Sequence, residues 1–223
     1  MLKSIKTSVL AVILISTAVI AHAQKKVNEG TLTYGITYEL TAEQQSMASQ
    51  LPAETKLKFS GNLLKIEMQQ GPAKITIISD GVQKNGLVLV DIPPIQKQYA
   101  VKTTKEETEQ TMGKPPVLSD FKGTGEKLKI GNYSTEKYTY KDDKGTAYEL
   151  WATNDIQLPE GIIGEEFKAL KGTPIKFTRV QNGVKAVLTI TALTEDKVGP
   201  ITLDVPSAYE VTTMDALRAM GGQ

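Results

Sequence analysis

Alternating apolar and polar residues recur in short runs along the chain from about residue 31, and glycine, asparagine, aspartate or proline separates the runs. The first run places Leu32, Tyr34, Ile36, Tyr38 and Leu40 on one side, with Thr, Gly and Glu between them. Side chains of a strand point alternately to the two faces of a sheet, so each run predicts a strand with one buried face. This pattern limits the chain to a mainly antiparallel β-structure.

Similar runs predict about ten strands in two halves. The apolar positions that define them lie at 32–40, 57–59, 64–68, 75–77, 87–92 and 99–101, and then at 128–130, 138–140, 148–152, 175–177 and 186–192. Asn182-Gly183 is the strongest hairpin signal, since a two-residue turn of this type needs positive φ at both positions. Residues 102–123 are rich in Lys, Thr and Glu, and they predict a loop or a short exposed helix that divides the halves.

Three short helices are also predicted. Thr41 to Gln44 forms a capping box at the start of the segment 41–51, which carries Met47 and Leu51. Apolar residues recur at helical spacing over 160–171, between Pro159 and Gly172, and Thr213 can cap a third helix over 214–220. We therefore expect one α+β domain over 24–223. Its large curved antiparallel sheet, a half-barrel, would have helices over the concave face and an apolar cavity beneath them.

The first 23 residues predict a secretory signal peptide. Lys3 and Lys6 precede the apolar run 9–20, and Ala21-His22-Ala23 is a typical cleavage site. Cleavage between Ala23 and Gln24 would leave a periplasmic or secreted protein. The alternative is an uncleaved amino-terminal anchor. We expect no lipid anchor, which would need Cys as the first mature residue, and no transmembrane span in the mature chain, whose aliphatic runs are short.

The composition excludes several kinds of chemistry. The chain has no Cys, and its single His lies in the expected leader, so Cys/His zinc sites, disulfides and His-dependent catalytic triads are excluded from the mature protein. A formal net charge of +1 gives no electrostatic case for nucleic acid as a partner. We expect no metal and no other cofactor.

Several short segments resemble an uncharacterised family of exported Gram-negative envelope proteins. They include Lys58-Phe59-Ser60-Gly61-Asn62, the strand 87–91, Glu149-Leu150-Trp151-Ala152-Thr153 and the closing element 205–209. Members of that family are similar in fold to the periplasmic lipoprotein carrier LolA and its receptor LolB, in which a half-barrel holds acyl chains under a helical lid. The resemblance implies that architecture and supplies no catalytic motif. The chain differs from that family at one position: family members often carry Cys near the position of Ser134, and this chain has no Cys.

Aromatic and apolar side chains of the predicted strands and helices are the candidates for a cavity lining. They are Tyr34, Tyr38, Met47, Leu51, Met68, Tyr138, Tyr140, Tyr148, Trp151, Ile163 and Phe167. Ordinary core packing is the alternative explanation for each of them. The leading hypothesis is a non-enzymatic periplasmic protein that binds or carries a hydrophobic ligand, such as a lipid or a lipoprotein acyl chain.

Two alternatives stay open. An envelope scaffold protein would use an exposed sheet edge or the 102–123 segment to contact a partner protein. An enzyme would be a hydrolase that relies only on carboxylates, Lys, Ser and Tyr, and the paired acids Asp142-Asp143 and Glu165-Glu166 are the residues to test. Solvated surface acid is the simpler explanation for both pairs.

Overall fold

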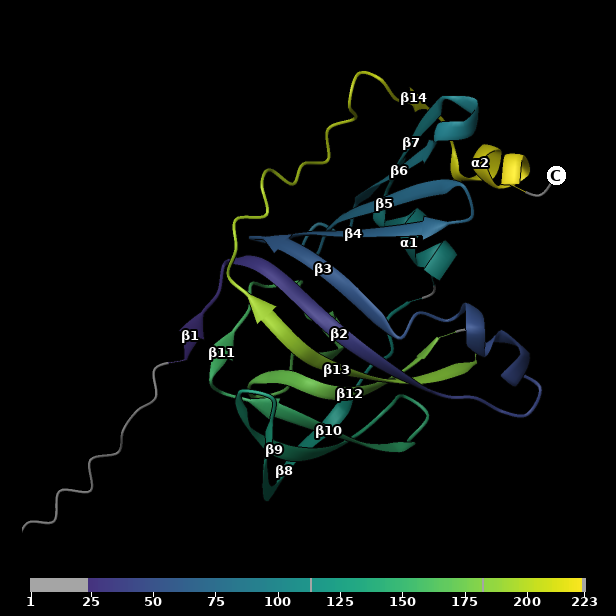
Figure 1. Cartoon of the computed structure of the whole chain (residues 1–223). Helices are drawn as coiled ribbons and strands as arrows, with labels where there is room; N and C mark the ends of the chain where they lie inside the picture. Colours follow the sequence, from purple (N-terminus) through teal and green to yellow (C-terminus); the bar gives the residue numbers. More distant parts are fainter. Residues whose placement is uncertain (1–23, 113, 182, 222–223) are drawn as a thin grey trace, which may run out of the picture.

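The computed structural model describes residues 24–112, 114–181 and 183–221, so the expected signal peptide over 1–23 lies outside the described residues. The fold is mostly β, with one sheet of 12 strands, a two-stranded pair β1–β11 and a few short helices. The order across the large sheet is β14-β7-β6-β5-β4-β3-β2-β13-β12-β10-β9-β8 (Figure 1). All its pairings are antiparallel except β14 with β7.

The first group of strands contains β1 Lys25–Lys26, β2 Glu29–Glu39, β3 Glu54–Ser60, β4 Leu63–Gln70, β5 Ala73–Asp80, β6 Gly86–Ile92 and β7 Lys97–Thr103. The second contains β8 Ser119–Ile130, β9 Tyr133–Lys141, β10 Ala147–Thr153, β11 Ile156–Gln157, β12 Thr173–Gln181, β13 Val184–Thr194 and β14 Glu210–Val211. The predicted large antiparallel sheet is confirmed. The expected half-barrel is not, because the sheet is neither closed nor strongly curled and ends in two edges, β14 and β8.

The two halves of the sheet meet at β2 and β13. Each half is a meander in which successive long strands pair, and the antiparallel β2–β13 ladder runs from Lys185 opposite Glu39 to Thr194 opposite Thr31. Leu32 and Ile190 are fully or almost fully buried in this ladder. The first and last long strands of the chain therefore lie at the centre of the sheet.

This arrangement forces the connection from β7 to β8 to cross the molecule. β7 lies next to one edge of the sheet and β8 is the other edge, so residues 104–118 span the distance between them. The crossing segment, as we call 104–118, contains α1 Lys105–Met112, which Figure 1 places behind the strands. Thr104 and Glu107 cap α1 reciprocally: Thr104 N–H donates to Glu107 Oε2 at 2.8 Å, and Glu107 N–H donates to Thr104 Oγ1 at 3.2 Å.

The predicted helices have mixed outcomes. The third is confirmed as α2 Met214–Gly221, with Thr213 Oγ1 accepting from Ala216 N–H. The predictions over 41–51 and 160–171 are wrong in extent, because these segments contain only the 3₁₀ helices η1 Gln45–Gln50 and η3 Glu165–Phe167. No residue of η1 is buried, and a short helix without a packed face has little to stabilise it. A third 3₁₀ turn, η2 Pro93–Ile95, precedes β7.

Two apolar cores lie on the sheet. The larger one is centred on β2, β9, β10, β12 and β13, and includes Phe59, Leu150 and Ile175. The smaller one packs the segment that follows β13 against β4–β7, with Ile201 contacting the cluster formed by Ile78, Leu87 and Ala100. This carboxy-terminal segment, 195–209, runs along the outside of the first meander to β14 (Figure 1).

A backbone contact between two glycines connects the halves a second time. Gly81 follows β5 and Gly161 lies between β11 and η3, and a Cβ at either position would overlap the backbone of the other. Gly161 also has φ +82°, which favours glycine. The loop after β5 and the segment 158–172 are thereby held against each other.

Replacement of Gly81 by Ala should separate these two segments. The added methyl has no room beside Gly161, and overpacking of this kind typically costs about 1–3 kcal/mol of unfolding free energy. Urea denaturation measures the loss, and hydrogen exchange should become faster in 158–172. Gly71→Ala is the control for the exchange measurement, because a Cβ there meets nothing within 4 Å: its φ of +55° disfavours alanine and costs some stability, but exchange in 158–172 should stay unchanged. Unchanged exchange in 158–172 in the Gly81 variant would contradict the contact.

Candidate functional site

A cleft of about 720 Å³ lies between the crossing segment and the second half of the sheet. We call it the first cleft. β9, β10 and β12 supply its floor, η3 lies at one side, and α1 with the residues after it covers it. Its lining residues are Lys84, Lys105, Thr108, Glu109, Lys114, Pro115, Pro116, Leu118, Tyr140, Asp142, Asp143, Lys144, Thr146, Tyr148, Glu165, Glu166, Phe167, Thr178, Arg179 and Val180. This volume falls in the range of small-molecule sites.

Stacked aromatic rings form the floor. Tyr140 lies opposite Tyr148 on the neighbouring strand, and their ring centroids are 5.6 Å apart. Phe121 stacks on the other side of Tyr140 at 5.4 Å, and Phe167 packs edge-on against Phe177 at 4.9 Å. Because Tyr140 and Phe167 are buried, these rings are fixed by the core below them. The floor is a rigid apolar surface.

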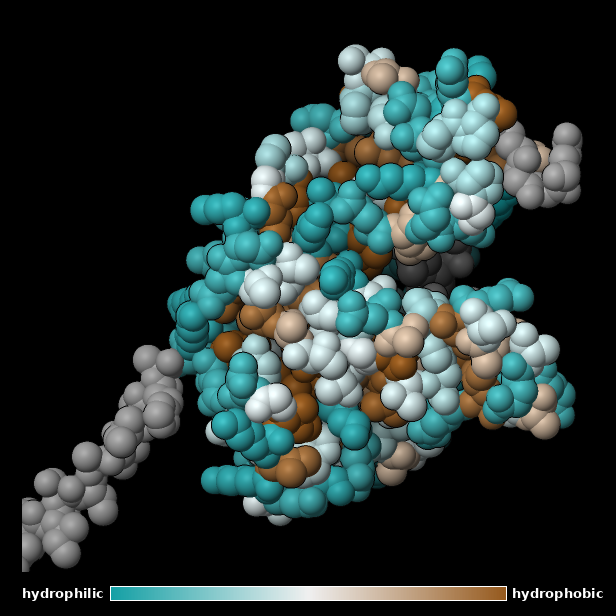
Figure 2. Space-filling view, in the orientation of Figure 1, coloured by the Kyte–Doolittle hydropathy of each residue, from teal (hydrophilic) through white to brown (hydrophobic). Residues whose placement is uncertain are grey.

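The crossing segment contributes a different kind of surface. Pro115 and Pro116 are exposed, and Leu118 packs against the larger core. Each proline has a fixed φ, which keeps this part of the connection extended. The first cleft therefore has apolar groups on its floor and its cover. On the opposite face, which Figure 2 shows, apolar surface is also exposed in the indentation between the two groups of strands.

Charged side chains surround this apolar surface in equal numbers, five basic and five acidic. Arg179 donates to Glu166 Oε1 at 2.6 Å, and Lys84 Nζ lies 3.1 Å from Glu165 Oε2. The Glu166 side chain is only 7% exposed, and Arg179 is the basic side chain that pairs with it there. The rim has no excess of either sign, which suits a neutral or zwitterionic ligand head better than a strongly charged one.

Ionisation in the cleft follows from these contacts. Burial raises the pKa of Tyr140 to about 12, so its hydroxyl is neutral at physiological pH. The hydrogen bond from Lys84 lowers the pKa of Glu165. Desolvation acts to raise the pKa of Asp142, but backbone hydrogen bonds from Thr146 and Lys144 outweigh it and leave the pKa lowered. The Tyr140 hydroxyl is therefore neutral at physiological pH, while the Glu165 and Asp142 carboxylates are ionised.

Three of the four paired acids, Asp142, Glu165 and Glu166, have local partners. Asp142 Oδ1 accepts from the N–H groups of Lys144 and Thr146, and its other oxygen accepts from the Tyr148 hydroxyl at 3.3 Å. Glu165 and Glu166 each pair with a basic side chain. Across the described ranges, no three acidic side chains cluster as metal ligands would.

A second cleft of about 330 Å³ lies on the other side of η3. Its lining residues are Gln24, Gly81, Val82, Lys84, Gln157, Leu158, Pro159, Glu160, Gly161, Ile163, Gly164, Glu165, Phe167, Lys168, Leu170, Gly172, Thr173 and Pro174. Lys84, Glu165 and Phe167 also line the first cleft, so the two clefts adjoin. We call this smaller space the second cleft.

The structure brings four of the predicted lining residues to these clefts. Tyr140, Tyr148 and Phe167 line the first cleft, and Ile163 and Phe167 line the second. The others lie elsewhere. Tyr34 and Tyr138 are buried in the core, the Tyr38 hydroxyl donates to Pro52 O, and Leu51 is half-buried next to η1.

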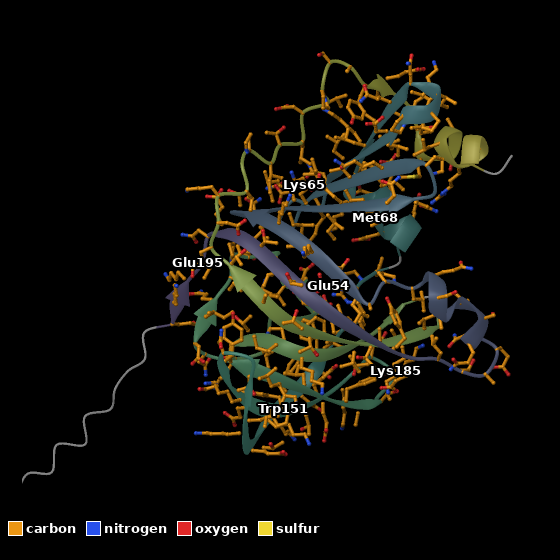
Figure 3. The ribbon with its side chains drawn as sticks, viewed as in Figure 1. Glu54, Lys65, Met68, Trp151, Lys185 and Glu195 are labelled. Carbon is orange, nitrogen blue, oxygen red and sulfur yellow. The ribbon has the colours of Figure 1, made fainter. Side chains whose placement is uncertain are left out.

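The remaining three predicted lining residues line neither cleft. Met47 and Met68 are 43% and 42% exposed, and neither lines a cleft. Trp151 alternates with the buried Leu150 and Ala152, so it faces the opposite side of β10, where Lys137 lies 6.0 Å from its ring. Met68 on β4 and Trp151 on β10 lie on separate parts of the sheet (Figure 3).

Other site residues were not predicted as such. The crossing segment was expected as a loop or short helix, and in the scaffold alternative as a contact for a partner protein, but not as part of a cleft. The pairing of Arg179 with Glu166 joins residues from different elements. One signal in the sequence was available: Thr104-x-x-Glu107 has the capping-box pattern, and it marks the start of α1. Lys84 has φ +63°, and no residue pattern indicated that its side chain would line both clefts.

The chain belongs to the DUF4412 family, a domain of unknown function, whose model matches residues 39–161. The match includes Lys84, the crossing segment and the floor tyrosines, and it ends before η3 and β12. No curated protein matches the chain. Of the helices in the described ranges, none is long and apolar enough to traverse a bilayer.

Asp80 holds the loop that carries Lys84. This carboxylate is 9% exposed, and its Oδ1 accepts from the N–H groups of Val82 and Gln83, each at 2.8 Å. Burial acts to raise the pKa of Asp80, but these hydrogen bonds outweigh it, and the pKa lies below its ordinary value. The ionised form therefore stabilises the fold above the unfolded-state pKa of about 3.9, and this contribution is lost as pH falls through the lower folded-state pKa.

We expect Asp80→Ala to lower the unfolding free energy by about 1–3 kcal/mol at neutral pH, because two loop N–H groups lose a charged acceptor. The difference from the wild type should shrink as the pH falls below about 4. Urea titrations at several pH values measure it. Asp143→Ala, at an exposed turn position, should change stability by less than about 0.5 kcal/mol. A pH-independent difference at Asp80 would show that the ionised carboxylate is not responsible.

Proposed function

We propose that the protein binds a hydrophobic ligand, such as a lipid or an acyl chain, in the first cleft, and that it does so without catalysing a reaction. The observation that carries this proposal is a cleft of about 720 Å³ with a rigid floor of aromatic rings. Apolar contact of this kind removes hydrocarbon surface from water, at roughly 25 cal/mol for each Å². The balanced rim charges would contact the polar head.

We also propose that the protein acts outside the cytoplasm. Lys3, Lys6, the apolar run 9–20 and the Ala21-His22-Ala23 site support export and cleavage before Gln24, to the periplasm or beyond. A ligand carrier fits that compartment because a lipid crossing an aqueous space needs its chain shielded from water. The resemblance to LolA-like envelope proteins supports the same class of ligand.

A second candidate is a scaffold protein that binds a partner chain through β8. This edge strand has 12 residues, and most of them are exposed. An unpaired edge offers backbone groups to an incoming strand. The edge is also interrupted by two register shifts and carries Lys122, Lys127 and Lys129, features that discourage pairing. We therefore favour the ligand-binding hypothesis.

Loss of a floor ring should weaken ligand binding. We expect Tyr148→Ala to reduce the affinity for a fluorescent fatty acid about tenfold or more, since it removes an aromatic contact surface. The control is Tyr209→Ala, which removes another half-buried tyrosine that packs on the smaller core, away from both clefts. Fluorescence titration measures both. Absence of probe binding by the wild type, or equal effects of the two variants, would contradict the proposed site.

Hydrogen exchange provides a second prediction. The connecting segments 41–51 and 160–171 and the short helix α1, 105–112, should exchange faster than β12 and β13, which are paired on both sides. A bound lipid should slow exchange in 105–112 and 160–171, which adjoin the first cleft. It should leave 41–51 unchanged, because no residue of that segment lines a cleft. Protection that is equal in all segments and unaffected by lipid would favour the scaffold hypothesis.

A further inference from the structure

The second cleft continues the first. Phe167, Lys84 and Glu165 line both spaces, so these three side chains form the only boundary that the two linings share among the described residues. Phe167 is buried and held edge-on by Phe177. A ligand in the first cleft that reaches Phe167 is therefore already at the wall of the second.

The rest of the boundary is easily displaced. The Lys84 and Glu165 side chains are 31% and 55% exposed, and solvated ion pairs of this kind contribute little to stability. Both residues belong to short connections rather than to long strands: Lys84 lies in the loop after β5, and Glu165 begins η3. A hydrocarbon chain can therefore separate Lys84 from Glu165 at little cost in free energy. The ring of Phe167 offers that chain an apolar contact between the two clefts.

The second cleft has a lining suited to a hydrocarbon end. Val82, Leu158, Ile163 and Leu170 supply apolar side chains, and the backbones of Gly81 and Gly161 close the space without side chains of their own. Its volume of about 330 Å³ is at the small end of the range for ligand sites. It is too small to hold a whole lipid, and it suits the end of a chain.

We propose that the second cleft is a subsite for the far end of a single long alkyl chain whose head lies at the rim of the first cleft. Phe167 and the Lys84–Glu165 pair mark where the chain crosses from one space to the other. The equal numbers of basic and acidic side chains at the rim suit a zwitterionic head. This inference rests on the proposed function, because it needs a ligand in the first cleft.

The test uses alkylphosphocholines of increasing chain length, each kept below its micelle-forming concentration. Affinity should rise along the series, because each buried methylene tightens binding about fourfold. Two variants alter only the second cleft: Val82→Glu adds a charge at a side chain that is 44% exposed, and Ile163→Trp adds bulk. Val211→Glu is the matched control, at an exposed valine on β14 that lines neither cleft.

The expected result depends on chain length. For octylphosphocholine both variants should bind like the wild type, and for hexadecylphosphocholine both should bind at least tenfold more weakly, while Val211→Glu matches the wild type throughout. Wild-type affinity for hexadecylphosphocholine in both variants, or a loss of the same factor at every length, would overturn the subsite and leave the first cleft as the binding site. A wild type that binds no member of the series would overturn the proposed function as well.

Discussion

The pairing of β2 with β13 determines the rest of the architecture. These strands are the first and last long strands of the chain, and their ladder joins two meanders that extend in opposite directions. Because the middle of the chain then lies at the two outer parts of the sheet, residues 104–118 must cross from one to the other. The first cleft lies beneath that crossing. In a sheet where every strand paired with the next strand along the chain, no connection would have to cross the molecule.

The cover of the cleft is the least independently stable part of this design. α1 has eight residues, and a helix of that length is marginal in water without packing or caps. The capping box at Thr104 and Glu107 fixes its start, while the proline pair beyond it limits the freedom of the following backbone. The floor, by contrast, belongs to the main core. The proposed ligand binding needs a cover of this kind, because a short helix over a floor in the main core can open without global unfolding.

Prediction from the sequence worked where the signal was local. Alternation at Leu32 and Tyr34 identified β2, and Thr213 identified the start of α2, because a strand face or a cap is encoded by neighbouring residues. It failed for 160–171, where Ile163, Phe167 and Leu170 have helical spacing but pack from irregular backbone around η3. These residues are apolar because they contact the sheet. An irregular backbone can place residues at this spacing against the sheet as well as a helix can.

The site was harder to predict than the fold for the same reason. Tyr140 and Tyr148 were identifiable as inward-facing strand residues, but their partners in the cleft come from α1, η3 and the loop after β5, which only the three-dimensional pairing brings together. Trp151 is an example of an error that the sequence alone could have prevented. It is adjacent to Leu150 on the strand, so its side chain points to the other face of β10. This alternation of faces follows from the residue numbers alone. The positions of Lys84 and Arg179 depend on contacts that no local pattern encodes.

The central claim is that this fold holds a hydrophobic ligand, and native mass spectrometry of the protein purified from the cell envelope without detergent tests it most directly. The account predicts a population heavier than the bare chain, whose added mass is released by organic solvent and identified as an amphiphile with an alkyl chain. A single species at the mass of the bare chain, unchanged after incubation with an envelope lipid extract, would contradict it.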